Sequence, residues 1–544
     1  MKVSRKWKFG MMALASASLL AACASEPDND GAATNTTGNT SNNEGEAEAS
    51  EEVADGNDLI IAVLSDASRL DPHTSNDVPS GNIQVNIYET LLRFNDDMEL
   101  ESNLATEWVD VDERTWEFTL QEGITFTDGE AFNADAVKAN IDRILDDEVG
   151  AARKILFEII DEVEVIDDTT VRFHTSEPFA PLPAHFAHYA SSMISPAVIE
   201  ADYDNFQNGD GNPGDYINEN PIGTGFFTYD EWNPGDSLRL VKNEDYWGDL
   251  PHVDSVTFRV VPEDLTRVSE LETGSAHIID PVTPSDMARV NDGDTMEVYQ
   301  RNAASITYLG FNTEREPYDD DRVRRAISMA LSKDAMMEGV LEGTGELAYG
   351  PINDTQFGFS TDVTQLERDP EAARELLAEA GYADGFETTI WTNDSRERMD
   401  IAELAQADLA EIGIQAEIEV VEWGAYLEQT GQGEHDMFIL GLSLGTMDAD
   451  YPMHMLFHSE NSGASGNRSF YQDAEFDALL QEARVEQDED VRFGLYEDAV
   501  DYLIEESPAA FLYHPDHIMG YRSDVSGFWA DASGLYQLQD VTID

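Results

Sequence analysis

The stretch TTIWTNDSRERMDIAELAQADLAEIGIQAEIEV, residues 388–420, decides the fold class because its hydrophobic period changes twice. Residues 388–391 have the composition of a strand, and a helical stripe of apolar residues then runs from Met399 to a stop at Gly413. From 414 to 420 apolar and polar residues alternate, as they do in a strand. A strand, a helix and a strand in this order favour a right-handed crossover between parallel strands. The sequence therefore predicts an α/β domain in the second half of the chain.

Two further helices are predicted on the N-terminal side of this unit. Apolar residues recur at helical spacing within 323–331, and Asp321 is available to cap that helix. Asp369 and Pro370 begin the other helix, and Gly381 is its predicted stop.

The length of the chain sets the number of packed units. A chain of 544 residues exceeds what one hydrophobic core usually serves, so at least two units are expected. The apolar run at 59–63 suits a buried strand, and further strands are predicted at 116–120 and within 163–173. The first half is therefore predicted to be mixed α and β.

Residues 1–22 have the layout of a secretory signal peptide. Four cations precede an apolar run at 9–22, which is too short to span a bilayer. The run ends in Leu-Ala-Ala followed by Cys23, which resembles a bacterial lipobox. That resemblance implies a diacylglycerol group on the Cys23 thiol and a mature chain that begins there. The alternative is an ordinary cleavage site beside an unrelated cysteine.

Cys23 is the only cysteine, which excludes an internal disulfide and a thiolate metal cluster. Once lipidated, it is also no nucleophile. Residues 23–57 then form the anchor and an acidic linker that is too polar to fold, so we expect a flexible spacer.

The formal net charge of −80 makes nucleic acid and anionic lipid poor partners. At molar salt the Debye length falls to about 3 Å, which would screen the self-repulsion of such a chain. We infer a saline or alkaline habitat and a halophilic acidic surface. Circular dichroism in low and molar salt tests this inference, and equal stability in both would refute it.

A series of short motifs in the mature chain carries a family resemblance. They are LDPH at 70–73, YETL at 88–91, GITFTDG at 123–129, PIGTG at 221–225 and RVRRA at 322–326. In their number, order and spacing the chain resembles the family 5 extracellular solute-binding proteins of bacteria. These are receptors of ABC importers for peptides, glutathione, nickel and opines.

The resemblance implies a two-lobed α/β fold like that of periplasmic binding proteins, with an enlarged first lobe. Lobe I would comprise 58–305, with an extra subdomain, and 514–544, and lobe II would comprise 306–513. Two crossover strands would join the lobes around a ligand cleft. The implied protein is a monomer on the outer face of the cytoplasmic membrane. It would pass its ligand to permease subunits, without catalysis and without a cofactor.

The same resemblance places a ligand-facing loop of lobe II at 441–451. Dipeptide-binding relatives carry in this loop a Trp and an aspartate that grips the ligand's amino group, but this chain has Leu442 and Gly445 there. Asp448 or Asp450 could substitute, or each could belong to a solvated acidic turn. Asp-Ala-Asp at 448–450, followed by Leu-Phe-His-Ser at 456–459, resembles the glutathione-binding branch more than the dipeptide-binding one. The remaining expected ligand-binding residues are Ser443, Thr446 and His73.

Basic residues are scarce in this chain and therefore more informative than acids. Arg396 and Arg398 follow the predicted strand at 388–391, at the crevice end where α/β sheets bind ligands. Either guanidinium could hold a ligand carboxylate through two hydrogen bonds, or both could pair with nearby acids. Trp423, after the next strand, could pack on the ligand or cap the core.

Within the family, nickel-chelate and opine receptors stay open as alternatives. Histidines are spaced three or four apart at 185/188, 454/458 and 514/517. No carboxylate motif of fixed spacing accompanies them, so no metal site is predicted. A secreted hydrolase is the alternative of another class, but the sequence has neither a Gly-x-Ser-x-Gly elbow nor a His-Glu-x-x-His helix.

Overall fold

The structure is a computed structural model that describes residues 57–544 except 293–294, 394 and 464–465. Cys23, the predicted signal peptide at 1–22 and the linker as far as residue 56 lie outside the described residues. Among the helices described, none combines the length and the apolar character that crossing a membrane would require.

A seven-stranded sheet in the order β12-β19-β11-β1-β10-β9-β8 organises the first lobe. Its strands are β1 (Asp58–Val63), β8 (Phe227–Asn233), β9 (Ser237–Lys242), β10 (Ser255–Val260), β11 (Ile278–Asp280), β12 (Met296–Asn302) and β19 (Asp516–Arg522). β1 is parallel to both β10 and β11, and the outer pairs are antiparallel. Leu59 and Ile61 belong to one core and Ala62 to another, so both faces of β1 are buried, as its apolar sequence predicts.

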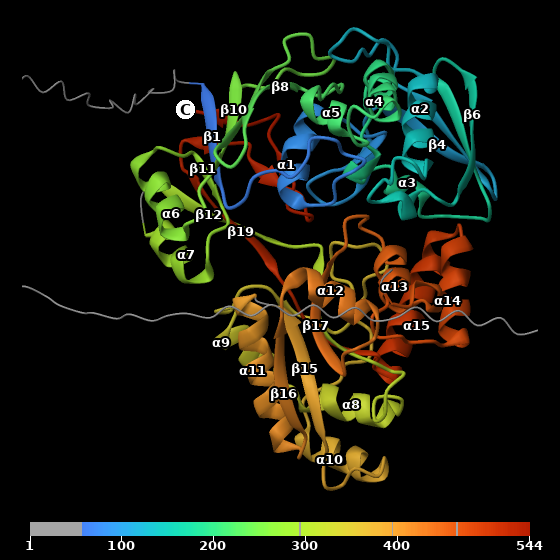
Figure 1. Ribbon diagram of the computed structural model, residues 1–544, viewed down its shortest axis with the longest axis vertical. Coiled ribbons are helices and arrows are strands. Elements are labelled where there is room, and N and C mark those ends of the chain that lie inside the picture. Colours follow the sequence, from blue (N-terminus) through green and yellow to red (C-terminus); the bar gives the residue numbers. More distant parts are fainter. Residues whose placement is uncertain (1–56, 293–294, 394, 464–465) are drawn as a thin grey trace, which may run out of the picture. The chain divides into compact units, whose positions relative to one another are not determined.

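Helices cover this sheet and position the loops at its edge. α1 (Val78–Ile87) begins where the Asp77 carboxylate accepts the Ser80 backbone N–H, which is a standard N-cap. α6 (Asp264–Thr273) packs on β11 and α7 (Pro284–Asn291) on β12 (Figure 1). The other helical segments of this lobe outside the subdomain are α4 (Pro196–Asn208), α5 (Asp215–Glu219) and the 3-10 turn Tyr189–Ser191.

A separate antiparallel sheet in the order β4-β5-β7-β6 forms a subdomain of the first lobe. It consists of β4 (Ala105–Asp112), β5 (Thr115–Leu120), β6 (Ile160–Asp167) and β7 (Thr170–Thr175), with α2 (Ala134–Leu145), α3 (Leu182–His185) and the 3-10 turn Lys154–Leu156. Phe118, Phe173 and Phe186 meet in its core, with ring centroids 4.5–5.3 Å apart. The subdomain therefore has its own core.

A six-stranded sheet in the order β14-β18-β13-β17-β15-β16 organises the second lobe. Its strands are β13 (Ser305–Phe311), β14 (Glu346–Leu347), β15 (Glu387–Asn393), β16 (Gln415–Val421), β17 (Met437–Ser443) and β18 (Ala509–His514). β15 and β16 are parallel and are joined by α11 (Arg396–Glu411), which confirms the predicted strand, helix and strand. Gly385 packs so tightly on Gly413 that an added Cβ would lie 1.8 Å from the Gly413 carbonyl oxygen. This close approach requires glycine at 385.

The helices of the second lobe are α8 (Asp321–Ala330), α9 (Lys333–Gly339), α10 (Pro370–Glu379), α12 (Trp423–Gly431), α13 (Asp450–Phe457), α14 (Ala474–Val485), α15 (Glu489–Glu506) and the 3-10 turn Ser459–Asn461. α10 starts at Asp369 and Pro370 as predicted. The predicted cap of α8 is wrong by one residue, because the side chain of Asp320 makes the cap and Asp321 is the first helical residue.

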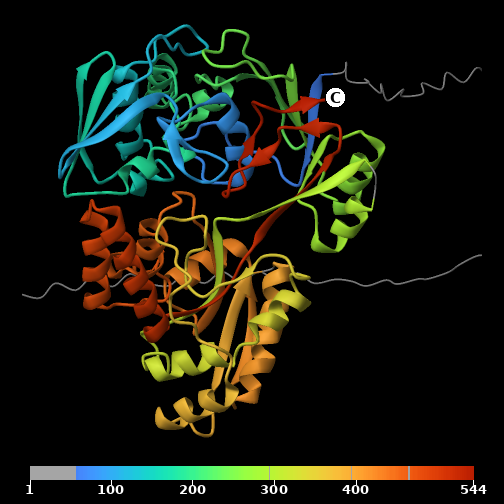
Figure 2. The same cartoon turned by 180° about the vertical axis from the view of Figure 1, so that it is seen from behind.

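Two passages of the chain connect the large sheets. β12 continues into β13 through Ala303 and Ala304, and β18 continues into β19 through Pro515. β12 and β19 pair antiparallel along their length, as Figure 2 shows from behind. The expected two-lobed fold with two crossover strands is confirmed. The remaining strands are β2 (Leu92–Phe94), β3 (Leu100–Ser102), β20 (Val525–Ser526), β21 (Trp529–Ala530), β22 (Tyr536–Gln537) and β23 (Thr542–Ile543).

Candidate functional site

Arg398 lies at the carboxyl edge of the second lobe's parallel strands. β15, β16 and β17 run in the same direction, so their carboxyl ends meet at one edge, where α/β sheets form ligand crevices. Ser395 caps α11 by accepting the Arg398 backbone N–H, which brings Arg398 into the first turn. Its Nη1 donates to Asn393 Oδ1 at 3.1 Å, and its guanidinium carbon lies 5.6 Å from the ring centroid of Trp423.

The guanidinium of Arg398 lies beside a glycine and a part-exposed tryptophan. A Cβ on Gly441 would lie 3.6 Å from Arg398 Nη2 and 3.0 Å from the Ile306 carbonyl oxygen, so the Gly441 backbone is next to the guanidinium. Trp423 is 42% exposed although its ring stacks on Tyr426. Within the described part of the chain, Arg398 forms no ion pair with a carboxylate. The cluster of Arg398, Asn393, Trp423 and Gly441 is therefore a candidate anion site, which we call the crevice cluster.

Arg396, the other predicted arginine, is placed differently. Its side chain is 86% exposed, and its Nε donates to Asp400 Oδ2 at 3.0 Å, one turn along α11. The structure therefore brings only Arg398 of this pair to Trp423.

The predicted ligand-facing loop is in part exposed and in part buried. Leu442 is half-buried, Ser443 is exposed, and Thr446 is buried with no hydrogen bond to its Oγ1. Gly445 lies against the first lobe, where an added Cβ would be 3.0 Å from His188 Nε2 and 3.5 Å from Ser533 Oγ. The position expected to hold the amine anchor is therefore in close contact with neighbouring side chains.

Both aspartates of this loop bind arginines of the same lobe. Asp448 is buried and pairs with Arg492 Nη2 at 2.6 Å, and Asp450 accepts from Arg484 at 3.0 and 2.9 Å. Burial raises the pKa of the Asp450 carboxyl, but Arg484, His454 and Arg492 together outweigh burial and hold that pKa well below its usual range. Each carboxylate thus has a counter-ion before any ligand arrives.

His73 lies apart from the crevice cluster, in a buried network. Arg143 Nη1 donates to His73 Nδ1 at 2.9 Å, and His73 Nε2 donates to the Ser192 carbonyl oxygen at 3.0 Å. Burial and then the Arg143 charge lower the pKa of His73 to about 3, so the ring is neutral. Asp71 and Asp202 complete the network around Arg143 at 2.8 and 3.0 Å.

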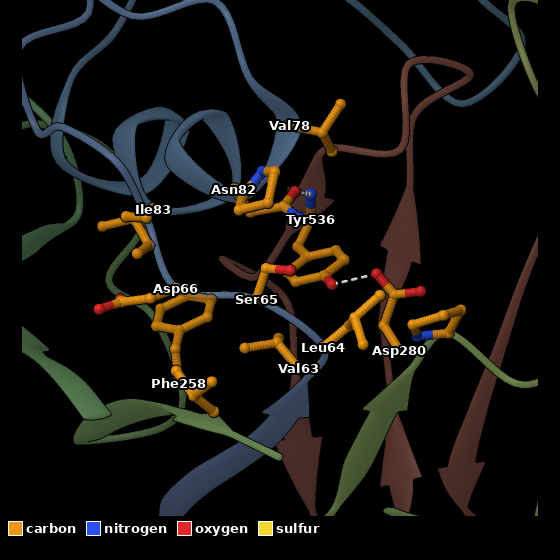
Figure 3. A pocket seen from close by; sticks show the side chains of 14 residues that line it. Val63, Leu64, Ser65, Asp66, Val78, Asn82, Ile83, Phe258, Asp280 and Tyr536 are labelled. Carbon is orange, nitrogen blue, oxygen red and sulfur yellow. Dashed lines mark hydrogen bonds between the residues drawn. The ribbon is translucent and has the colours of Figure 1, made fainter. Parts of the chain in front are cut away.

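A pocket of about 220 Å³ opens at the corresponding edge of the first lobe (Figure 3). It lies where the parallel strands β1, β10 and β11 end, which is the position that the crevice rule predicts. Leu64 and Val78 line it and are 44% and 38% exposed, so its lining includes apolar side chains open to solvent. No sequence motif identified this pocket, although the loop after the predicted strand at 59–63 was a signal for it.

Asp280 and Tyr536 form the polar wall of this pocket. The Tyr536 hydroxyl donates to Asp280 Oδ2, although 256 positions separate the two residues (Figure 3). Burial raises the pKa of the Asp280 carboxyl to about 6, against the opposing effects of Tyr536 and Arg267. No local sequence pattern could have joined a carboxylate at the end of β11 to a tyrosine near the C-terminus.

Backbone hydrogen bonds join the two halves of the candidate site. Leu444 N–H donates to the Ala304 carbonyl at 2.7 Å, and Ala304 N–H donates to the Ala532 carbonyl at 2.6 Å. The loop at 441–451 is thereby linked to the segment that leads into Tyr536. Farther along, Arg153 of the first lobe donates to the Tyr451 hydroxyl at 2.8 Å.

The histidine pairs do not assemble a metal centre in the described ranges. His454 and His458 stack with ring centroids 4.6 Å apart. Among residues 57–544 with the stated gaps, no group of three or more His, Cys, Asp or Glu is placed to hold a metal ion.

Comparison with known proteins relates the chain to binding proteins. Residues 99–464 match the family described as bacterial extracellular solute-binding proteins, family 5 Middle. The glutathione-binding protein GsiB of Shigella dysenteriae is 32% identical over 495 residues, which are 89% of this chain and 94% of that protein.

Solved structures share the fold over almost the same length. HbpA2 from Haemophilus parasuis has a TM-score of 0.79 at 28% identity and covers 90% of this chain and 100% of its own. DppA from Helicobacter pylori, in complex with the peptide STSA, has a TM-score of 0.75 at 29% identity, covering 89% and 98%.

Proposed function

Because the chain belongs to the family 5 bacterial extracellular solute-binding proteins, which are binding proteins and not enzymes, we propose that it captures glutathione or a short peptide. It then delivers this ligand to the permease of an ABC importer. The support is the glutathione-binding relative, together with the peptide-bound neighbour of the same fold.

The crevice cluster carries this proposal. Peptides and glutathione have at least one carboxylate, and a guanidinium matches a carboxylate with two parallel hydrogen bonds. Arg398 points its charge at the crevice edge, beside an exposed Trp423 on which a ligand side chain could pack. In a chain of net charge −80, a guanidinium that no described carboxylate neutralises favours an anionic ligand group.

The lobe boundaries follow from the same proposal. We assign 58–305 and 514–544 to lobe I and 306–513 to lobe II, with hinges at Ala303, Ala304 and Pro515, where the chain leaves one large sheet for the other. A ligand that touches both lobes shifts the equilibrium toward a closed form. Small-angle scattering with saturating ligand should show a smaller radius of gyration, and an unchanged profile alongside tight binding would contradict closure.

The location proposed for the protein is the outer face of the cytoplasmic membrane. A lipid on Cys23 would hold the monomer there, and the linker up to residue 57 would let the folded part reach the permease.

Identification of the bound ligand tests this function. The protein should be purified without denaturation, and the ligand it carries should be identified by mass spectrometry. Calorimetry with glutathione and with di- to tetrapeptides follows. We expect a peptide-like molecule with a free carboxylate. A nickel complex or an opine as the sole ligand would contradict the proposal, and so would specific turnover of a peptide.

A further inference from the structure

We propose that the first-lobe pocket around Asp280 binds an ammonium group of the ligand, carried on a short aliphatic stem. This inference rests on the proposed function and names the second chemical group that the ligand must present. The crevice cluster would then take the carboxylate, and the first-lobe pocket would take the positive charge.

The walls of the pocket suit an aliphatic stem. Apolar side chains come from the end of β1, the start of α1 and the strand β10, and they are Val63, Leu64, Val78, Ile83, Phe258 and Val260. Hydrocarbon is favourably removed from water against such walls, whereas a fully polar ligand group would lose hydration there. Of the side chains labelled in Figure 3, Asp280 is the carboxylate held by the Tyr536 hydroxyl.

The Asp280 carboxylate lacks a counter-ion. Tyr536 occupies Oδ2, and within the described residues no donor contacts Oδ1 and no cation pairs with the group. Arg267 acts on it only from a distance, because its own donors go to the carbonyl oxygens of Val261 and Pro281 and to Asp264. Removing a charged carboxylate from water without giving it a partner costs free energy, and a ligand ammonium would offset this cost by pairing with the carboxylate.

Asp66, which lines the same pocket, and Asp531, which lines a different pocket of the first lobe, already accept hydrogen bonds from the protein. Asp66 accepts the Trp232 indole N–H at 3.1 Å and the Gly235 backbone N–H at 2.7 Å. Asp531 accepts the backbone N–H groups of Ser533 and Leu535 at 2.8 and 3.0 Å. These hydrogen bonds fix both carboxylates in place, so Asp280 is the better candidate for an incoming cation.

The second lobe adds an independent argument. Asp448 and Asp450, the two aspartates of its loop at 441–451, are held by Arg492 and Arg484. A ligand ammonium therefore needs another anion. Asp280 provides one at the carboxyl edge of the first-lobe sheet.

The number of protons released on binding distinguishes an ammonium bound beside Asp280 from a ligand bound elsewhere. An ammonium beside Asp280 favours its ionised form and lowers its pKa, so binding near pH 6 should release a fraction of a proton. At pH 8 the carboxyl is already ionised and release should vanish. The groups that face Asp280 are Tyr536, Asp66 across the pocket and the more distant Arg267.

The probes are chosen to separate two sources of the ammonium group. Glutathione against N-acetylglutathione tests the α-ammonium, and Ala-Lys against Ala-norleucine tests a basic side chain. Binding is measured by calorimetry at pH 6 and pH 8 in buffers of different ionisation enthalpy. The proteins are wild type, Asp280→Asn and the control Asp142→Asn, whose carboxylate lies in an exposed surface pair with Lys138.

We expect Asp280→Asn to bind the ammonium-bearing probe about 30-fold or more weakly than wild type does and to release no proton on binding. Asp142→Asn should bind the probe as wild type does. The preference of wild type for the ammonium over its neutral analogue should disappear in Asp280→Asn. Equal affinity of wild type and Asp280→Asn for the ammonium-bearing probe would overturn the inference. Absence of proton release when wild type binds the probe at pH 6 would also overturn it, and that measurement does not depend on whether the variant folds. If wild type binds none of the four probes, the proposed function fails as well, and that failure is visible before any variant is made.

Discussion

Asp450 and Arg484 form a two-point ion pair between α13 and α14, with Nε and Nη2 of the arginine 3.0 and 2.9 Å from the two carboxylate oxygens. Asp450 is only 1% exposed, and His454 Nε2 lies 3.6 Å from the same carboxylate. This geometry indicates that the Asp450–Arg484 pair stabilises the fold, so mutation of Asp450 should change the free energy of unfolding.

Asp450→Asn should lower the free energy of unfolding by about 3–5 kcal/mol, because it leaves the partly buried Arg484 without a counter-ion. Urea denaturation measures this. The control Asp400→Asn removes an exposed pair on α11 and should change stability by no more than about 0.5 kcal/mol. If Asp450→Asn unfolds like the control yet loses ligand affinity, Asp450 grips the ligand instead.

Acid should begin to destabilise the protein below about pH 6.5 through its buried histidines. Burial lowers the pKa of His73 and His454 to about 3 and of His435 and His514 to about 4. The unfolded chain therefore binds more protons between about pH 6.5 and 4, and stability falls as pH drops through that window. Urea midpoints at pH 7.5, 5.5 and 4.5 should decline in that order. A midpoint that stays constant, or rises toward acid, would contradict this account.

Asp280→Asn should stabilise the ligand-free protein at neutral pH. The folded-state pKa of about 6 exceeds the ordinary pKa of 3.8, so the carboxyl contributes its stability below pH 3.8 and loses it as pH rises through 6. The variant should gain up to about 3 kcal/mol at pH 7.5 and nearly nothing at pH 3.5. Thermal unfolding at both values measures this. An equal effect at the two pH values would show that Asp280 is not desolvated in the folded state.

Cys23→Ala should release the protein from the membrane. The apolar run at 9–22 is too short to anchor the chain by itself, so the lipid would be the attachment. Fractionation of cells that express wild type and variant measures this. Retention of the variant in the membrane fraction would point to a different anchor.

Local patterns predicted the elements of the fold but not its long-range pairs. The switch of period within 388–420 was sufficient to predict β15, α11 and β16, since amphipathic period and a glycine stop are local properties. The start of α11 lay at Arg396, three residues before the predicted Met399, because Ser395 caps the helix. The contact of Asp280 with Tyr536 joins residues far apart in sequence, and an acid-rich chain offers too many candidate carboxylates to select one.

The two arginines of α11 differ in a way that only the fold determines. Arg396 is exposed and tied to Asp400, whereas Arg398 turns toward Asn393, Trp423 and Gly441. The pair therefore provides its own matched control, with the same charge on the same helix turn.

The most direct test is calorimetry of the ligand that copurifies, or of glutathione, with wild type, Arg398→Ala and Arg396→Ala, at the salt concentration where the fold is most stable. Loss of a buried bidentate contact costs about 2–5 kcal/mol, so Arg398→Ala should weaken binding roughly 30-fold to several-thousand-fold. Arg396→Ala should bind as wild type does, and amidation of the ligand carboxylate should remove the difference between Arg398→Ala and wild type. If Arg398→Ala binds the ligand as tightly as wild type, the crevice cluster does not hold a carboxylate and the central claim is wrong.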